Sequence, residues 1–421
     1  MHRPIRGAFA LLAVTPLAAA AQSLLPPRDA GPAEHVPIAI EAALEWRSVL
    51  ERAVRNYPRF IELEARRHES DALHRRSRSL FAGRPSIALG YRSDDPLDDY
   101  GLAEYETGLT LPLWRFGERQ AAGRIATSAS DETAAAHAAL VWEIAGALRA
   151  VLWDIEDAVN GVELAAEALA VAEEIERVVA RRHSLGDLPL EDTLLAESTV
   201  LERQAELIER RAALVDAEFA YEILTGLRAR PPALVETPTE QRDFSASHPL
   251  LTLARAEAER ARASLELSAR AAKGSPLLSI GPRRERDPLA DYYTDSVGVE
   301  VSIPVGGGAH ADVETAASRR QVAAAEASLA ALERRLHADL HDALHTLEAT
   351  ESALALAQRR AELAARHREM GRTAFEQGEI SLVDLLRRDE AARAAAREAR
   401  RLEVQRGRAI AAVNQAVGVL P

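Results

Sequence analysis

Residues 105–112 read Tyr-Glu-Thr-Gly-Leu-Thr-Leu-Pro, and residues 297–304 read Val-Gly-Val-Glu-Val-Ser-Ile-Pro. Apolar and polar side chains alternate in both stretches, which is the pattern of a β-strand with one apolar and one polar face. The two stretches are 192 residues apart, and the same offset pairs Gly186 with Gly378. A period this long lies outside the range of about 20 to 50 residues seen in solenoids, so it indicates duplication of a whole structural half.

Each half is predicted to contain a helix, a strand hairpin, a long helix and a further helix. The first repeat spans 22–227, with strands at about 84–92 and 104–114, and the second spans 248–421, with strands at about 276–284 and 295–305. The proline-rich stretch 228–247 links them. The first helix is predicted at about 42–81, and the long helices are predicted to break at Gly186 and Gly378 because glycine interrupts helical continuity.

The long helical segment of the second half carries apolar residues at steps of three and four, the spacing of a coiled-coil seam. These residues are Val322, Ala325, Leu329, Leu332, Leu336, Leu340, Leu344 and Leu347. At 1.5 Å per residue, a helix of about 60 residues is roughly 90 Å long, so it must bury its seam on similar helices. The predicted fold class is therefore mainly α with a small β part, built from duplicated helix–hairpin–long helix halves.

The composition excludes several classes of function. Residues 1–21 combine early basic residues, an apolar stretch and a run of alanines, which predicts a signal peptide. The chain has no cysteine and a net charge of -13, which argues against thiolate metal sites and against nucleic acid as a partner. Nucleophile-elbow, zinc-protease and phosphate-loop motifs do not occur, so we predict neither an enzyme nor a bound cofactor.

The strand hairpins have the composition of membrane strands. Their apolar face suits lipid, and the aromatic residues in and around them suit an interfacial belt: Tyr91, Tyr105, Trp114, Tyr292 and Tyr293. An open sheet edge is not tolerated in lipid, because its unpaired N–H and C=O groups would have no partner there. Four strands would then need other chains to close a barrel, whereas a soluble four-stranded sheet is the alternative.

The chain resembles the TolC-like outer-membrane efflux proteins. The resemblance is sharpest at 109–114, at 301–305 and at 375–386, where the sequence reads Phe-Glu-Gln-Gly-Glu-Ile-Ser-Leu-Val-Asp-Leu-Leu. It implies a homotrimer in the cell outer membrane, with a twelve-stranded β-barrel and a periplasmic α-helical barrel. It also implies a passive conduit of a tripartite efflux system, which joins a periplasmic adaptor and an inner-membrane transporter and exports small molecules or metal ions.

The same resemblance implies a periplasmic tip that closes the conduit. The turns at Gly186 and Gly378 would form this tip, and Asp384, with Asp192 as its repeat partner, would match the acidic gate residues. Arg387 stands where many relatives have a second acidic residue, so an ion pair with Asp384 could replace a ring of carboxylates. Capping of a helix N-terminus is the alternative role for both aspartates.

A histidine stripe and two other functions remain as alternatives. His337, His341 and His345 are spaced by four residues on one helical face and could ligate a metal ion, but a solvated polar face is the favoured explanation. The alanine-rich second half is similar to the heavy-metal efflux branch. The rival functions are a periplasmic coiled-coil scaffold or adaptor, and the same duct serving type I protein secretion.

Overall fold

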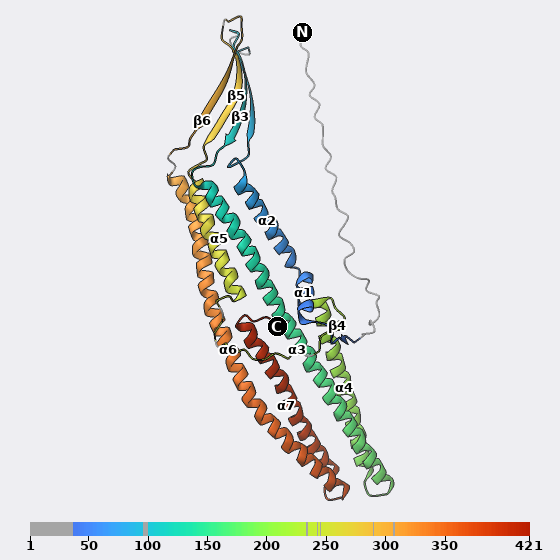
Figure 1. Cartoon of the computed structure of the whole chain (residues 1–421). Coiled ribbons are helices and arrows are strands. Elements are labelled where there is room, and N and C mark those ends of the chain that lie inside the picture. The colour runs from blue at the N-terminus through green and yellow to red at the C-terminus, as the bar shows by residue number, and fades with distance from the viewer. Residues whose placement is uncertain are drawn as a thin grey trace, which may run out of the picture. The chain divides into compact units, whose positions relative to one another are not determined.

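The structure, a computed structural model, describes residues 37–95, 100–232, 235–241, 243–244, 246–288, 290–305 and 308–421. The predicted signal peptide, residues 1–21, lies outside the described residues. Helices account for most of the described chain (Figure 1). The helices are α1 (Trp46–Asn56), α2 (Phe60–Arg78), α3 (Glu118–Ser184), α4 (Leu190–Thr225), α5 (Pro249–Ala271), α6 (Gly308–Glu376) and α7 (Leu382–Ala416).

The helix predicted at 42–81 is in fact two helices, and it begins later than predicted. Helix α1 ends at Asn56, and Tyr57 has an extended backbone with φ −76° and ψ 131°. The ring of Pro58 disfavours helical geometry at the residue before it, which explains the break at Tyr57. Helix α2 then starts at Phe60.

Four strands form one antiparallel sheet with the order β2-β3-β5-β6. The strands are β2 (Ser86–Ser93), β3 (Ala103–Pro112), β5 (Leu277–Arg286) and β6 (Thr294–Ser302), each within a few residues of its predicted range. Strands β2 and β3 form the hairpin of the first half, β5 and β6 form that of the second, and β3 pairs with β5 across the halves. The sheet of one chain is therefore open, with β2 and β6 at its edges.

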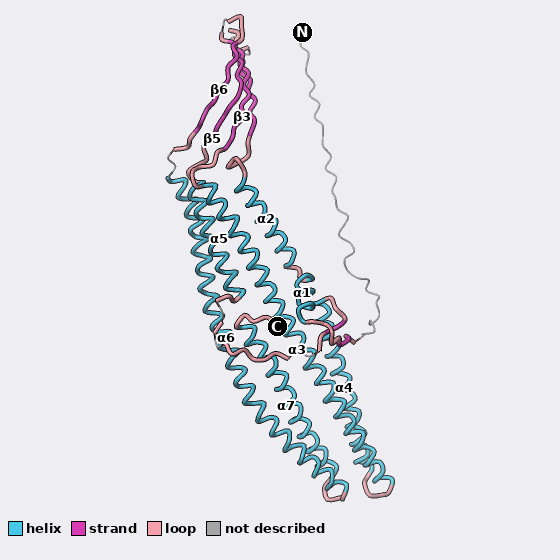
Figure 2. Tube along the Cα trace, viewed as in Figure 1, coloured by secondary structure: helices cyan, strands magenta, loops and turns pink. Residues whose placement is uncertain are grey.

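The helices continue the order of the strands. Next to the sheet, α3 packs between α2 and α5, and α5 packs against α6, so the order α2-α3-α5-α6 follows that of the strands to which these helices connect (Figure 1). Farther from the sheet, α3 pairs with α4, α6 pairs with α7, and α3 contacts α7. The strands lie at one end and the α3/α4 and α6/α7 turns at the other (Figure 2). The sheet and the helices thus form one continuous layer. One edge of this layer consists of β2, α2 and α4, and the other consists of β6 and α6.

Long helices bury their seams as the sequence predicts. Helices α3 and α6 contain 67 and 69 residues, which corresponds to about 100 Å each. In α6 the predicted seam residues Leu336, Leu340 and Leu347 are buried. Among the described helices, one, α3, contains a stretch long and apolar enough to cross a membrane, but half of that stretch is buried inside the protein. A core helix passes the same test, so this stretch is weak evidence for a membrane span.

The described parts of the linker pack onto the helices. Strand β4 (Ala229–Arg230) pairs in parallel with β1 (Ala39–Ile40). Buried Arg149 of α3 donates to both carboxylate oxygens of Glu236 at 2.7 and 2.8 Å. The side-chain amide of Asn414 in α7 donates to Glu236 at 2.8 Å. One linker carboxylate therefore ties the long helix of the first half to the last helix of the second.

Candidate functional site

The register of the sheet separates an apolar face from a polar one. In the middle of the sheet, Ile87 lies opposite Leu109, Leu109 opposite Ile280, and Ile280 opposite Val299. Because side chains alternate between faces, this row and its neighbours on the same face form one apolar surface. The row is exposed, from 38% at Leu109 to 72% at Ile87. One side of the sheet is thus apolar and has no partner within the described chain.

The opposite face of the sheet is polar and carries ion pairs. Glu104 of β3 is buried and accepts from Arg92 of β2 at 2.7 Å and from Arg283 of β5. The hydroxyls of Thr110 and Ser279 lie 3.1 Å apart on the same face. In the middle of the sheet, polar side chains thus lie on one face and aliphatic side chains on the other, whereas Arg284 and Asp295 pair on the apolar face near the β5–β6 loop. Such alternation is found in membrane strands that line a wet interior.

Aromatic residues lie at both ends of the strands. The rings of Tyr91 and Tyr105 are 4.9 Å apart, and Tyr293 lies 6.5 Å from Tyr105. Two residues beyond the other end of β3, the indole N–H of Trp114 donates to the backbone oxygen of Ser79 at 3.0 Å. Strand β3 has 10 residues, which gives about 34 Å along the strand and roughly 26 Å of height at a tilt near 40°. This height matches the apolar band of a membrane barrel. The fifth predicted aromatic, Tyr292, is exposed outside the ring cluster.

The edge helices α4 and α6 each expose an apolar stripe with a seven-residue spacing. The exposed residues are Leu194, Leu201 and Ile208 on α4, and Leu356, Leu363 and Met370 on α6. Leu201 lies 11 residues after the start of α4, and Leu363 lies 13 residues before the end of α6. The two stripes therefore run in opposite directions at similar heights above the turns. A seven-residue apolar repeat is the pattern of a helix that packs against another helix.

The predicted breaks at Gly186 and Gly378 are tight helix ends of the same kind. The glycines have φ values of +83° and +79°, a left-handed conformation that costs glycine nothing. After α3, the amide of Asp187 donates to Arg182 O, and after α6, the amide of Glu379 donates to Ala374 O. These bonds satisfy carbonyls that a helix end otherwise leaves without partners. The sequence repeat thus reappears as two equivalent turns.

The two turns pack together into one tip. Val179 of α3 and Leu382 and Leu385 of α7 are fully or almost fully buried in a shared cluster. Arg182 joins the hairpins, because its guanidinium donates to Phe375 O at 2.8 Å and lies 5.1 Å over the Phe375 ring. Sequence reasoning missed Arg182, although Phe375 stands in a motif that it singled out.

Asp384 lies in the first turn of α7 as part of a reciprocal cap. The backbone N–H of Asp384 donates to Ser381 Oγ at 3.2 Å, and Ser381 Oγ donates to the Asp384 carboxylate at 2.8 Å. Arg387 lies 3.8 Å from the same carboxylate in an exposed pair. Asp192 lies at the equivalent place in α4, which begins after Pro189 without a side-chain cap. Asp384 thus helps to cap its helix and still presents a charge to solvent at the tip.

The three histidines of the stripe make different contacts. The ring of His337 packs at 4.6 Å against Phe244, whereas the rings of His341 and His345 are parallel and 6.3 Å apart. Within the part of the chain that the structure describes, no group of three His, Cys, Asp or Glu side chains is placed to hold a metal ion.

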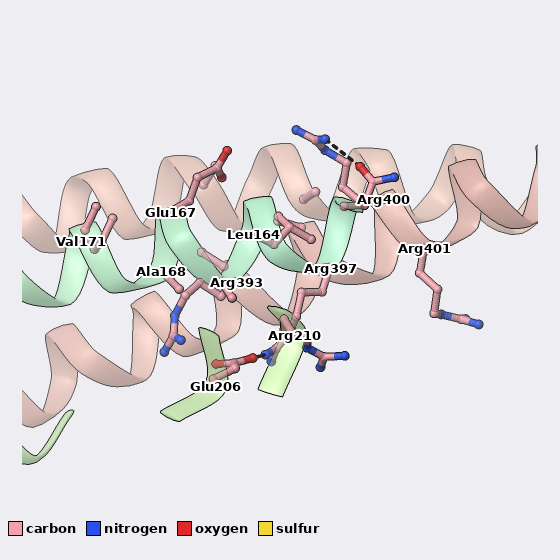
Figure 3. Close-up of a pocket in the computed structure, with 18 of the residues that line it drawn as sticks. Leu164, Glu167, Ala168, Val171, Glu206, Arg210, Arg393, Arg397, Arg400 and Arg401 are labelled. Atoms are coloured by element: carbon pink, nitrogen blue, oxygen red, sulfur yellow. Dashed lines mark hydrogen bonds and ion pairs between the residues drawn. The ribbon is translucent and has the colours of Figure 1, made fainter. Parts of the chain in front are cut away.

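A cavity of about 610 Å³ lies between the two helical hairpins. It is lined from α3, α4, α6 and α7, and Figure 3 shows Arg393, Arg397 and Arg400 of α7 around it. Sequence reasoning did not single out these arginines. They are three of 52 lysines and arginines in the chain, and only the packing of four helices places them beside one cavity.

Comparison with known proteins rests on structure alone. No family model matches the sequence, and no curated protein matches it significantly. The outer membrane protein VceC of Vibrio cholerae matches with a TM-score of 0.71 at 15% identity, over 89% of this chain and 96% of that one. The CmeC outer membrane channel of Campylobacter jejuni matches with a TM-score of 0.69 at 16% identity, over 88% and 85%.

This chain has the fold of these outer-membrane channels. The MtrE outer membrane channel of Neisseria gonorrhoeae, solved in an open state, also matches, with a TM-score of 0.62 at 15% identity, over 89% of this chain and 88% of that one. The predicted TolC-like fold, mainly helical with a small sheet, is therefore confirmed. At such identities the likeness concerns the fold only.

Proposed function

We propose that this chain is the outer-membrane channel of a tripartite efflux system, a passive conduit made of three copies. The observation that carries the proposal is the open sheet with one exposed apolar face. Such a face is stable in lipid, but the backbone groups at its two edges are not stable there without partners. Three copies, each contributing four strands, would close a twelve-stranded barrel and leave no free edge.

The helical layer supports the same assembly. Its edges lie on the same sides as the edges of the sheet, and both edge helices expose apolar stripes at matching heights. The three-fold rotation that pairs β2 of one copy with β6 of the next would also pack α4 antiparallel on α6 of the neighbouring copy. This contact would bury Leu201 and Leu363. A ring of three copies would then form a periplasmic α-helical barrel beneath the membrane barrel.

The remaining parts of the proposal follow from this assembly. The protein would lie in the outer membrane with its helices in the periplasm, and it would contact outer-membrane lipid through the apolar sheet face. A conduit without catalysis of its own needs an energised partner, so we infer an inner-membrane transporter and a periplasmic adaptor. The cargo would be small molecules or metal ions.

We place the gate of the conduit at the tip formed by the turns at Gly186 and Gly378. Asp384 and Asp192 lie in the first turns of the helices that follow, and Arg387 lies beside Asp384. Three copies of an exposed carboxylate near one axis would repel each other and attract cations. The state in which MtrE was solved supports the idea that channels of this fold open and close.

Membrane fractionation of cells that express the chain tests the proposal. We expect the protein in the outer-membrane fraction, as an assembly of three copies that resists heat in detergent, and we expect ion conductance in planar bilayers. A periplasmic scaffold or adaptor would instead appear in the soluble extract and would not conduct. A deletion strain sensitive to small molecules, with normal protein secretion, would separate efflux from type I secretion.

A further inference from the structure

The cavity between the helical hairpins has apolar walls of small residues. Helices α3 and α7 contribute Ala165, Ala168, Ala392 and Ala396, and Gly161 of α3 lies next to the stem of Arg210. Small side chains leave space where larger ones would close the gap between helices. The volume of about 610 Å³ is within the range of about 300 to 1,000 Å³ typical of small-molecule sites.

Arginines outnumber carboxylates in the lining of this cavity, and within the described chain all of these arginines except Arg210 are ion-paired with a carboxylate. Three acidic residues line it, namely Asp157, Glu167 and Glu206, against six arginines. The arginines are Arg210, Arg368, Arg393, Arg397, Arg400 and Arg401, and Figure 3 shows most of them around the space. A guanidinium has five N–H donors and suits carboxylate, sulfonate and phosphate groups.

Two of these arginines are held in place by carboxylates. Arg393 is 11% exposed and pairs with Asp389 at 2.8 Å and with Glu390 at 2.5 Å. Its third nitrogen, Nη1, is buried and has no hydrogen-bond partner among the described residues. Arg397 is bonded to Glu206 and Glu390 at 3.0 and 3.1 Å. Carboxylates thus fix two guanidiniums, while a buried donor is left without a partner.

Arg210 differs from these two arginines. Its guanidinium forms no ion pair or hydrogen bond within the described residues, although it lines the same space from α4. A cation without a partner next to apolar walls favours a ligand that brings both a negative group and an apolar body.

We propose that this cavity binds a small organic anion, a molecule with a carboxylate, sulfonate or phosphate group on an apolar body. The negative group binds between Arg210 and Arg393, and the apolar body lies against the alanines of α3 and α7. The ligand contacts α3, α4 and α7, so it joins the two hairpins of one chain. The site lies within a single copy, and its failure would leave the proposed conduit function intact.

Isothermal titration of the purified full-length protein in lipid nanodiscs tests the proposal, with empty nanodiscs as the blank. The probes are naphthalene-1-sulfonate and 1-naphthylmethylammonium, which share a ring system and differ in charge. We expect the sulfonate to bind saturably, once per chain, and at least about tenfold more tightly than the cation. Equal binding of both probes would overturn the proposal, as would binding of inorganic sulfate as tight as that of the aromatic sulfonate.

Two variants locate the binding. Arg210→Gln removes an exposed cation that holds no other residue, and we expect it to weaken sulfonate binding about tenfold. Ala396→Leu fills part of the cavity without changing a charge and should abolish binding. Arg359→Gln, an exposed residue of α6 that pairs with Glu362 away from the cavity, is the matched control and should bind as the unchanged protein does. Sulfonate binding that survives both cavity variants would contradict the proposed site.

Discussion

His248 shows how a single buried side chain can make stability depend on pH. It precedes α5, is 1% exposed, and accepts a hydrogen bond from the Leu250 N–H at its Nδ1 atom. The ring also packs against Trp142 at 5.1 Å. Burial lowers the pKa of His248 from its usual value of 6.5. Protonation of Nδ1 would remove the acceptor that caps α5, and it would place a charge in an apolar setting.

We predict that folding stability falls as the pH drops below about 6.5. Between the lowered pKa of folded His248 and the pKa of the unfolded chain, the unfolded state binds more protons, so stability rises with pH there. The loss amounts to at most about 1.4 kcal/mol per pH unit. His248→Asn keeps a capping acceptor without titrating, and it should flatten the dependence of the unfolding midpoint between pH 5 and 7. His341→Asn, at an exposed histidine, should retain the pH dependence of the unfolding midpoint. An unchanged pH dependence in His248→Asn would show that His248 is not its cause.

Asp384 can be tested for two roles separately, because its carboxylate both accepts from Ser381 and carries charge at the tip. Asp384→Asn retains an acceptor for the cap but removes the charge, whereas Asp384→Ala removes both. If the ion pair of Asp384 with Arg387 helps to close the conduit, both variants should raise ion conductance in planar bilayers, and Ala should cost up to about 1 kcal/mol of stability in addition. Asp187→Asn, at the other turn, is the control. Unchanged conductance in both Asp384 variants would remove this residue from the gate.

At the scale of the strand, β6 carries neighbouring residues on opposite faces. Val299 lies in the central apolar row and is 64% exposed, whereas Glu300 points to the polar face. We predict that Val299→Arg costs about 2 to 4 kcal/mol, because arginine on a lipid-facing strand is destabilising near the middle of the membrane. Glu300→Arg introduces the same side chain one residue later and should be tolerated. The measurement is the amount of heat-resistant assembly in outer membranes, and equal tolerance would mean that this face does not contact lipid.

The helices and strands could be predicted from local sequence patterns, whereas contacts between distant residues could not. Alternation placed the strands, and the glycines at 186 and 378 placed the helix ends, because each of these signals lies within a few neighbouring residues. The helix break at Tyr57 was not predicted, although the effect of Pro58 on the residue before it is equally local. The pair of Arg149 and Glu236 spans 87 residues, and the cavity arginines come from three helices. No short-range spacing marks such partners, so only the packed structure reveals them.

For the whole molecule, the assembly of three copies makes a geometric prediction. In the proposed assembly, the antiparallel stripes on α4 and α6 would bring Leu201 of one copy close to Leu363 of the next, since both lie at nearly the same height above the turns. The chain has no cysteine, so introduced cysteines are the sole thiols. Leu201→Cys combined with Leu363→Cys should give covalent dimers and trimers with a short bismaleimide.

The mismatched pair supplies the control for this cross-linking. Leu356 lies on the same stripe of α6 but seven residues farther from the tip, which corresponds to about 10 Å along the helix. Leu201→Cys with Leu356→Cys should therefore cross-link much less efficiently than the matched pair. Each single variant should stay monomeric on denaturing gels, because one thiol per chain has no partner at that edge. Equal cross-linking of the matched and mismatched pairs, or failure of the matched pair, would mean that α4 and α6 do not pack together between copies. The copies would then have to contact each other through other helices.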